Sequence, residues 1–455
     1  MINFQYIKTN AEKVKQNIIN RKFDPKKADI DKLLQIDAKK NKLQIEIDSL
    51  RAKRNELSKI MGNSQGKPPV ELLTEAKQIK ESLATLESQI EPLQKEFEQI
   101  MQWLPNMALD EVPVGKGELD NIEISAWHPR LNYLDKEKLK GTDGSKEFMP
   151  RVGTNADSDF TPIPHYEIGV QKGLIDLETG SKVSGSRFYY LKNEGVLLMY
   201  ALFDKLIRKL IKDGFTPMYV PVLVREKALF GTSHFPADQD QVYEINNELI
   251  EDAQKLYLIG SSEPSLFSYH SDKIIPENQL PIKMYTQSTC FRSEAGSWGK
   301  DVRGMKRAHQ FEKVEMDMII KPNLEEAQKT LEYLLSINEW LLQELEIPYH
   351  VINMCTGDLG YAAAAKKYDI EVFLPSTGEY MEVMSDSITT DFQTRRLNIK
   401  CTNESGEKNF AYTVNDTGAT HRLLIAIIEH YQQKDGSIKV PKMLQDFIGK
   451  EYIGK

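Results

Sequence analysis

Two stretches near the start of the chain repeat apolar residues every seven positions. In residues 30–61 one row of the repeat consists of Ile36, Leu43, Leu50 and Leu57, and a second row contains Ile47 and Met61. In residues 71–101 the two rows consist of Leu72, Ile79, Leu86, Leu93 and Ile100, and of Ala76, Leu83, Ile90 and Phe97. Glycines and prolines interrupt the pattern at 62–69. The spacing predicts two long helices that pair as an antiparallel coiled coil about 45 Å long.

Downstream of these helices the apolar positions alternate between helical and extended periods. Residues 195–212 predict an amphipathic helix. Residues 214–224 predict an edge strand or an interface strand, because Pro217 and Pro221 interrupt a β-branched segment. Other expected elements are helices at 10–20, 324–345 and 423–428 and a short strand within 256–266. The mixture of helices and strands predicts an α+β protein.

A hairpin expected from two extended segments, 281–294 and 307–320, carries the most informative polar residues. A polar loop with three glycines at 295–304 separates the two arms. The arms would present a guanidinium group, carboxylates and an aromatic face together: Arg292, Glu294, Phe311 and Glu315. Such a surface could bind a nucleotide, because arginine pairs with phosphate and an aromatic ring stacks on a base. Spacing alone favours a hairpin with cross-strand ion pairs and a core phenylalanine.

Charge is distributed unevenly between the two long helices. The chain has 455 residues, 40% of them hydrophobic, and a net charge of −8, which argues against a protein that coats nucleic acid uniformly. Residues 30–61 contain eight Lys or Arg against five Asp or Glu, whereas residues 71–101 contain three against seven. A basic helix and an acidic partner would attract one another and leave a basic edge for a phosphate backbone. A dimerisation coiled coil or a spacer is the alternative.

The cysteines and the apolar runs bear on the cellular location. Cys290, Cys355 and Cys401 lie far apart without a CxxC pair, so neither a disulfide framework nor a zinc site is expected. The first residues lack an apolar signal segment, and no run of about 18 apolar residues occurs. We therefore expect a soluble cytoplasmic protein with no membrane partner.

Three segments resemble the motifs of a known enzyme class. FRSEAGSWGKDVRG at 291–304, followed by RAHQFEKVEM at 307–316, resembles motif 2 of the class II aminoacyl-tRNA synthetases in the form used by bacterial-type seryl-tRNA synthetases. Residues 195–224 resemble motif 1, and NDTGATHRLL at 415–424 resembles motif 3. The resemblance implies a tRNA-binding domain at 1–105 with its helical arm at about 30–101, and a linker at 106–164. A class II catalytic domain at 165–455, built on an antiparallel sheet flanked by helices, would follow.

The resemblance also implies an activity and its partners. A member of this family activates L-serine with ATP to seryl-adenylate and transfers serine to the 3' end of tRNA(Ser), with tRNA(Sec) as a further candidate. A homodimer is expected, and DNA is not expected as a partner. Two alternatives are a synthetase-like paralogue that acts as an RNA-binding or interaction protein, and a ligase that loads an amino acid onto a carrier protein.

Site residues follow from the positions that match the family's motifs. The expected catalytic residues are Arg292, Glu294 and Arg422. The expected ATP-binding residues are Arg292, Ser293, Glu294, Ala308, His309, Gln310, Phe311, Glu382, Val383, Met384, Ser385 and Arg422. The expected serine-binding residues are Ser261, Ser262, Glu263, Arg292, Glu315 and Thr417. Glu382 and Ser385 are expected to hold Mg²⁺ together with ATP, and no zinc is expected.

Two segments depart from the family's pattern. The family usually has a run with serine, cysteine and asparagine after the residue that corresponds to Glu382, whereas this chain reads VMSDSITT at 383–390. Motif 3 is one residue shorter between Asn415 and Arg422. Both departures lie beside the expected amino-acid pocket, so they bear on the selectivity for serine.

Overall fold

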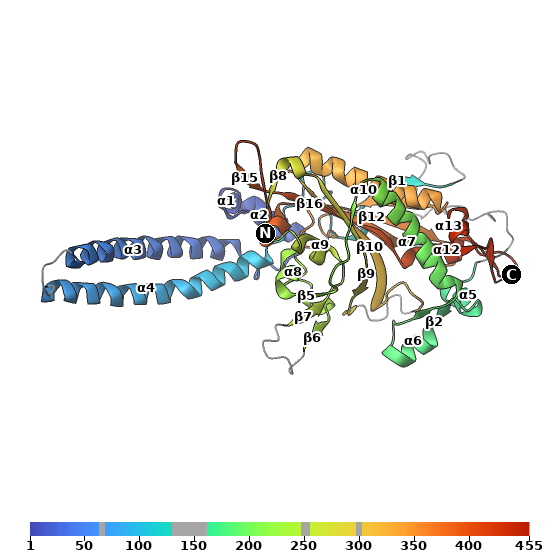
Figure 1. Ribbon diagram of the computed structural model, residues 1–455, viewed down its shortest axis with the longest axis horizontal. Helices are drawn as coiled ribbons and strands as arrows, with labels where there is room; N and C mark the ends of the chain where they lie inside the picture. Colours follow the sequence, from blue (N-terminus) through green and yellow to red (C-terminus); the bar gives the residue numbers. More distant parts are fainter. Residues whose placement is uncertain (63–68, 130–159, 161, 247–254, 297–302, 455) are drawn as a thin grey trace. The chain divides into compact units, whose positions relative to one another are not determined.

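The chain divides into two compact units, Met1–Met107 and Ala108–Lys455 (Figure 1). The computed structural model describes residues 1–62, 69–129, 160, 162–246, 255–296 and 303–454. Most of the predicted turn at 62–69 and of the predicted loop at 295–304 lies outside the described residues.

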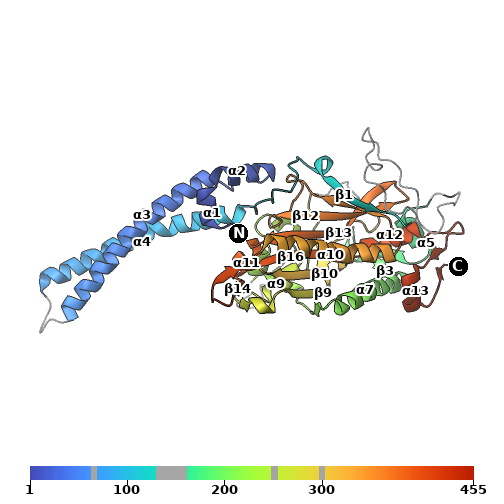
Figure 2. The same ribbon diagram turned by 90° about the horizontal axis from the view of Figure 1, so that it is seen from above.

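The first unit consists of helices α1 (Phe4–Thr9), α2 (Ala11–Asn20), α3 (Ile30–Gly62) and α4 (Val70–Trp103). Helices α3 and α4 lie side by side along their length in Figures 1 and 2. Residues of the predicted heptad rows form the apolar core between them: Ile47, Leu57, Ile79 and Leu83. Ion pairs join the basic helix to the acidic one, from Lys32 to Glu96 (2.5 Å) and from Arg51 to Glu87 (2.9 Å). The predicted coiled-coil hairpin is therefore confirmed.

An eight-stranded sheet forms the centre of the second unit, with the strand order β1-β11-β12-β13-β16-β10-β9-β4. In that order the strands are Ile122–Trp127, Tyr349–Asn353, Lys366–Leu374, Glu379–Thr390, Tyr412–Thr420, Gln310–Ile320, Ile282–Phe291 and Thr216–Pro217. Neighbouring strands are antiparallel, except that β4 pairs parallel to β9 at the edge. The predicted hairpin is the antiparallel pair of β9 and β10, and the expected α+β class is confirmed.

Helices and smaller sheets surround this central sheet. The helices are α5 (His165–Gln171), α6 (Leu177–Ser184), α7 (Glu194–Lys212), α8 (Glu226–Gly231), α9 (Glu263–Ser268), α10 (Leu324–Glu344), α11 (Phe392–Leu397), α12 (Arg422–His430) and α13 (Lys442–Ile448). The smaller sheets consist of β2 (Ile175–Asp176) and β3 (Tyr190–Leu191); β5 (Leu223–Arg225), β6 (Glu244–Ile245) and β7 (Leu256–Leu258); β8 (Ile274–Pro276), β14 (Lys400–Thr402) and β15 (Lys408–Phe410); and β17 (Ile438–Lys439) and β18 (Tyr452–Ile453). Within the described residues, no helix combines the length and apolarity needed to cross a bilayer.

The structure corrects two predicted extended segments. Residues 214–224 do not form one strand: β4 ends at Pro217 and β5 begins in another sheet after Pro221, because proline cannot donate to a strand ladder. The strand expected within 256–266 is limited to β7. The chain then turns into α9, where Pro264 is accommodated in the first turn of the helix.

Residues of β16 alternate between the two faces of the central sheet. Val414 belongs to the hydrophobic core, and Asp416 accepts a hydrogen bond from Asn338 Nδ2 of α10 (2.7 Å). Helix α10 covers this face, as the view in Figure 2 shows. Asn415 and Thr417 line a cavity on the opposite face. The buried core and the cavity therefore use alternate positions of the same strand.

A β-bulge changes this alternation between β10 and β16. Lys313 pairs with Thr420 and Glu315 pairs with Thr417, which leaves Gly418 as an additional residue on β16. Thr417 and Thr420 are three positions apart, yet both line cavities on the same face. The bulge supplies the residue that restores the second side chain to this face.

A second bulge lies between β12 and β13, where Val383 is the additional residue on β13. Strict alternation would place Glu382 and Ser385 on opposite faces, since they are also three positions apart. Both residues nevertheless line the same cavity. The bulge therefore makes it possible for these two side chains to act together.

Candidate active site

Two adjoining cavities, with volumes of about 450 Å³ and about 50 Å³, open on the face of the central sheet opposite to α10. Residues that line both cavities are Arg292, Glu294, Arg307, Lys313, Glu382 and Thr417. The larger cavity is also lined by Ser261, Glu263, Glu315, Tyr361, Lys367, Ser385 and Asn415. The smaller is also lined by Ala308, Phe311, Val383, Thr420, His421 and Arg422. Most of the expected serine-binding and ATP-binding residues are therefore brought together.

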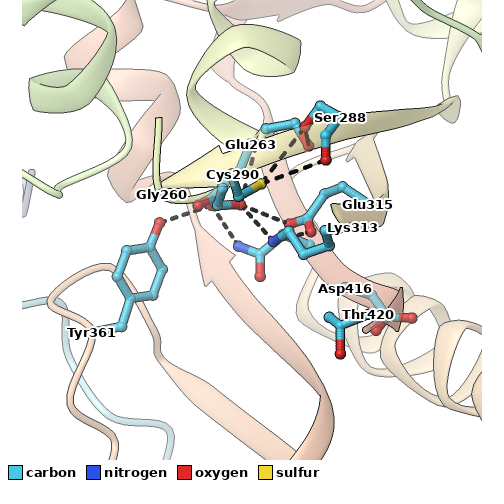
Figure 3. Close-up of polar contacts among 12 residues, drawn as sticks. Gly260, Glu263, Ser288, Cys290, Lys313, Glu315, Tyr361, Asp416 and Thr420 are labelled. Atoms are coloured by element: carbon cyan, nitrogen blue, oxygen red, sulfur yellow. Dashed lines mark hydrogen bonds and ion pairs between the residues drawn. The ribbon is translucent and has the colours of Figure 1, made fainter. Parts of the chain in front are cut away.

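A cluster of compensated charges forms the inner wall of the larger cavity. The ammonium group of Lys313 donates a hydrogen bond to Ser261 Oγ (2.8 Å) and forms an ion pair with Glu315 Oε2. Ser261 Oγ donates to Glu315 Oε1 (3.3 Å). Figure 3 shows Lys313 and Glu315 beside one another. Their side chains are only 3% and 4% exposed, so each charge depends on the other for its stabilisation.

A second carboxyl group, that of Glu263, enters the larger cavity from the first residue of α9. Its Oε1 atom accepts hydrogen bonds from Tyr361 Oη (2.8 Å), Gln393 Nε2 (2.6 Å) and Asn415 Nδ2 (2.6 Å). Tyr361 points toward Glu263 in Figure 3. Burial raises the pKa of Glu263 to about 7, although the bonds from Gln393 and Tyr361 favour the ionised form. This carboxyl group therefore changes its charge near neutral pH.

Arg292 lies where the two cavities meet. Its Nε atom donates to the carbonyl oxygen of Gly260 (3.1 Å), and its guanidinium carbon lies 5.5 Å from the centre of the Phe311 ring. Arg307 Nη1 lies 3.4 Å from Glu294 Oε2, so a second arginine and a carboxylate border the same space. The arrangement combines an aromatic face with cations, which suits the binding of a nucleotide.

Arg422 and Glu382 form the opposite side of the smaller cavity. Arg422 Nη1 donates to the carbonyl oxygen of Glu382 (2.9 Å) and to its Oε2 atom (3.3 Å). Burial acts to raise the pKa of Glu382, but the positive charges of Arg422, Lys367 and Arg292 outweigh it and lower the pKa. Glu382 is therefore ionised at neutral pH. An ionised carboxylate beside the hydroxyl of Ser385 is a donor set suited to Mg²⁺.

Five expected binding residues do not line either cavity: Ser262, Ser293, His309, Gln310 and Met384. Met384 is buried in the hydrophobic core, and Ser262 is fully buried. His309 Nδ1 donates to the carbonyl oxygen of Arg292 (2.9 Å), so this side chain supports the backbone of the hairpin. The segments in which the family resemblance placed these residues all border the cavities, whereas the direction of each side chain depends on the strand and its bulges.

The run at 383–390 that departs from the family's pattern is divided in the same way. Ser385 and Ser387 line the larger cavity. Met384 and Ile388 belong to the hydrophobic core, and Asp386 accepts a hydrogen bond from Asn338 of α10 (3.3 Å). These three residues do not contribute side chains to the cavity wall.

The structure adds residues that the sequence did not single out: Lys313, Tyr361, Lys367 and Asn415 in the cavity wall, and Gln393 behind Glu263. Lys313 could have been found from strand alternation, because it precedes Glu315 by two positions on β10. Tyr361 and Gln393 are 98 and 130 residues away from Glu263, and no local pattern connects them to it.

Comparison with known proteins shows the family to which this chain belongs. A model of the seryl-tRNA synthetase N-terminal domain matches residues 1–108, and a model of the tRNA synthetase class II core domain (G, H, P, S and T) matches residues 243–431. The serine–tRNA ligase of Dictyoglomus turgidum is 41% identical over 451 residues, which cover 99% of this chain and 98% of that protein. The chain belongs to the seryl-tRNA synthetase family. The serine–tRNA ligase of Pyrococcus horikoshii is 38% identical over 456 residues, covering 99% of this chain and 96% of that protein.

Solved structures of seryl-tRNA synthetases extend the similarity to the fold. The seryl-tRNA synthetase from Pyrococcus horikoshii complexed with ATP gives a TM-score of 0.86 at 36% identity, over 100% of this chain and 99% of that chain. The cytoplasmic enzyme from Naegleria fowleri in complex with AMP gives 0.81 at 28% identity, over 99% and 96%. The class II core match includes every residue expected to bind serine or ATP in this member of the seryl-tRNA synthetase family.

Proposed function

We propose that this chain activates L-serine with ATP to form seryl-adenylate and pyrophosphate, and then transfers serine to the 3' end of tRNA(Ser). The observation that carries the proposal is one cavity that is lined by buried Glu263 and Glu315 together with Arg292. Similarity to serine–tRNA ligases over almost the whole chain supports it. The relatives give no support to a paralogue without this activity or to a ligase for a carrier protein. tRNA(Sec) is a further candidate acceptor.

In the first step, an oxygen of the serine carboxylate attacks the α-phosphorus of ATP. The bond from phosphorus to the bridging oxygen breaks, and pyrophosphate leaves with the electron pair. Arg292 would orient the carboxylate and the α-phosphate, and Arg422 would neutralise charge on the pyrophosphate side. Positioning and charge stabilisation account for the acceleration, since no covalent enzyme intermediate is required.

The adenine base would lie in the smaller cavity. Phe311 would stack on its face, Glu294 would accept a hydrogen bond from its amino group, and the backbone near Ala308 would border its edge. The proximity of these three residues in one cavity supports the assignment.

We propose that Glu382 and Ser385 hold Mg²⁺ with the phosphates of ATP. The ionised carboxylate and the hydroxyl on one face of β13 fit this role. Among the described residues, no group of three or more His, Cys, Asp or Glu side chains is arranged to hold a metal ion. Phosphate oxygens would therefore complete the coordination, as is usual for Mg²⁺. When bound, the ion would neutralise charge that develops on the phosphates.

Selectivity for serine would depend on its hydroxyl group. Glycine and alanine are smaller than serine, so the pocket cannot exclude them by size. Glu315, Ser261 and half-buried Thr417 would form hydrogen bonds with the serine hydroxyl group, and glycine or alanine would leave those bonds unmade, which weakens their binding. Glu263 would accept a hydrogen bond from the substrate ammonium group.

In the second step, a hydroxyl group of the terminal ribose attacks the carbonyl carbon of seryl-adenylate, and AMP leaves. We propose that the α3–α4 hairpin binds the tRNA. The excess of Lys and Arg in residues 30–61 supports this role.

The three cysteines, which are buried and free, fit a reducing compartment such as the cytoplasm.

We further propose that the chain forms a homodimer through the segment that contains α7, β4 and β5. Large apolar side chains are exposed there: Tyr200 (48%), Tyr219 (100%) and Leu223 (40%). Exposed apolar patches of this kind mark interaction surfaces. Analytical ultracentrifugation of the full chain tests the proposal, and a monomer at micromolar concentration would contradict it.

Exchange of labelled pyrophosphate into ATP, measured with each amino acid in turn, tests the proposed activation. We expect serine to stimulate exchange and Arg292→Ala to abolish it. If none of the amino acids stimulates exchange, the enzymatic function is contradicted. If glycine or alanine stimulates exchange in place of serine, the assignment of serine as the substrate is contradicted. Charging of tRNA(Ser) with labelled serine then tests the transfer step.

A further inference from the structure

The backbone of Met305 lies between two buried histidines that the proposed mechanism does not use. The Met305 N–H donates to His165 Nε2 (3.1 Å), and the Met305 carbonyl oxygen accepts from His421 Nε2 (2.7 Å). His165 and His421 are 1% and 3% exposed, and Met305 is fully buried. A Cβ at Gly304 would lie 2.2 Å from His165 Nε2, so the close approach depends on glycine there. The contact joins α5, the segment that precedes β10 and the start of α12.

The hydrogen bonds fix the tautomers of both rings. Because a backbone N–H can only donate, His165 Nε2 carries no proton and the ring proton is on Nδ1. That Nδ1 donates to Glu429 Oε1 (3.0 Å), and Glu429 Oε2 accepts from Ser376 Oγ (2.6 Å). His421 must carry its proton on Nε2, and burial lowers the pKa of this ring to about 3. Two neutral, directional groups therefore hold the Met305 backbone from opposite sides.

The next residue along the chain connects this contact to the ATP side of the site. The carbonyl oxygen of Lys306 accepts a hydrogen bond from Arg422 Nε (3.1 Å). Consecutive residues of the hairpin, Met305 and Lys306, are thus tied to consecutive residues at the start of α12, His421 and Arg422. His421 also lines the smaller cavity, with its ring centre 5.3 Å from that of Phe311. A shift of the Met305 backbone would therefore move the walls of the proposed ATP site.

Building on the proposed function, we propose that His165 and His421 are positioning residues that hold Met305 and Lys306 so that the ATP-binding wall is formed before ATP arrives. Neither histidine takes part in the chemical step. Without the His421 bond, the buried Met305 carbonyl loses its partner and the segment occupies other arrangements. ATP would then have to select the competent arrangement, which weakens its apparent affinity by the fraction of molecules in that arrangement.

A pair of substitutions at one position tests the proposal with serine-dependent pyrophosphate exchange. We expect His421→Leu to raise the KM for ATP about tenfold, because a fall in the competent population to about one tenth weakens binding by that factor. The kcat at saturating ATP and the KM for serine should stay close to wild type. His421→Gln should restore the KM for ATP, since its amide nitrogen can donate to the Met305 carbonyl in place of Nε2. His165→Gln, which keeps an acceptor for the Met305 N–H, should likewise stay close to wild type.

His430→Leu is the matched control, because His430 Nε2 makes the same kind of bond to the carbonyl oxygen of Phe373 (2.6 Å) at the other end of α12. It should lower the melting temperature without changing the KM for ATP. If His421→Leu does not fold, His421→Asn replaces it, since the shorter amide cannot reach the Met305 carbonyl.

An unchanged KM for ATP in the folded His421→Leu or His421→Asn variant would overturn the positioning role. An equal rise in His421→Gln, or in the His430 control, would also overturn it, since the effect would then be one of general stability. Failure of the wild-type chain to exchange pyrophosphate with serine would instead contradict the proposed function. In that case direct ATP binding, measured by calorimetry with the same variants, still decides whether the bonds from His165 and His421 to Met305 shape the ATP site.

Discussion

Replacing Gln393 with methionine should shift the pH dependence of serine activation toward alkaline pH. Gln393 Nε2 donates a 2.6 Å hydrogen bond to Glu263 Oε1, and burial already raises the pKa of Glu263 to about 7. A hydrogen bond to a charged group contributes about 1.5–3 kcal/mol, and one pKa unit corresponds to about 1.4 kcal/mol. Tyr361 and Asn415 continue to donate hydrogen bonds to Glu263. The protonated form of Glu263 also loses the bond from Gln393, so only part of this free energy changes the pKa. We therefore expect a rise of about one unit in the pKa of Glu263.

The direction of the pH effect follows from the charge of the substrate. The serine ammonium group binds better to the ionised form of Glu263, so kcat/KM for serine should rise with pH and level off above this pKa. In the wild-type chain it should fall about tenfold from pH 8 to pH 6, because the ionised fraction falls from about nine tenths to about one tenth around a pKa of about 7. In the Gln393→Met variant the rising limb should lie about one pH unit higher.

Pyrophosphate exchange at serine concentrations well below the KM measures this limb directly. Gln432→Met is a suitable control, since Gln432 is also buried but bonds to the carbonyl oxygen of Ile163 (2.6 Å), away from the cavities. Its pH profile should coincide with that of the wild type. A Gln393→Met profile that coincides with the wild type, or that moves toward acidic pH, would refute the assignment of the limb to Glu263.

Three further predictions concern the arm, the metal and the face of the sheet that α10 covers. Deleting residues 30–101 should leave serine-dependent exchange largely intact and abolish tRNA charging; unchanged charging would make the arm a spacer. Glu382→Gln should raise several-fold the Mg²⁺ concentration needed for half-maximal exchange, and an unchanged requirement would remove Glu382 from the metal site. Burial raises the pKa of Asp416 to about 8, so the native state binds more protons than the unfolded state between about pH 4 and pH 8, and stability falls as pH rises through this window. Asp416→Asn should reduce that slope by up to about 1.4 kcal/mol per pH unit in urea unfolding, and parallel curves for the two proteins would contradict the prediction.

The features that could be predicted from the sequence depend on residues close to one another in the chain. The coiled coil follows from a seven-residue period, and the core residues Ile47, Leu57, Ile79 and Leu83 all lie on the predicted rows. The hairpin of β9 and β10 follows from two extended segments around a polar loop. Motif resemblance placed Arg292, Glu382 and Arg422 in one site although they come from distant segments, and the structure brings all three to the smaller cavity.

The remainder depends on strand register and on contacts between distant residues. A regular strand would place the side chains of Glu382 and Ser385 on opposite faces. The bulge at Val383 brings both side chains to one cavity, and the sequence does not reveal this bulge. The same alternation buries Met384, which motif position alone had placed among the ATP-binding residues. The support for Glu263 comes from side chains in other segments, so the raised pKa of this residue could not be read from its neighbours in sequence.

The bulge at Gly418 divides β16 into two parts with separate alternation. Asn415 and Thr417 precede it and line the larger cavity, with Thr417 also bordering the smaller one, whereas Thr420 and Arg422 follow it and line only the smaller cavity. A residue gained or lost at the bulge would reset the alternation of the second part and leave the first part in place. A change in the length of β16 at Gly418 would therefore act first on the side chains that border the smaller cavity.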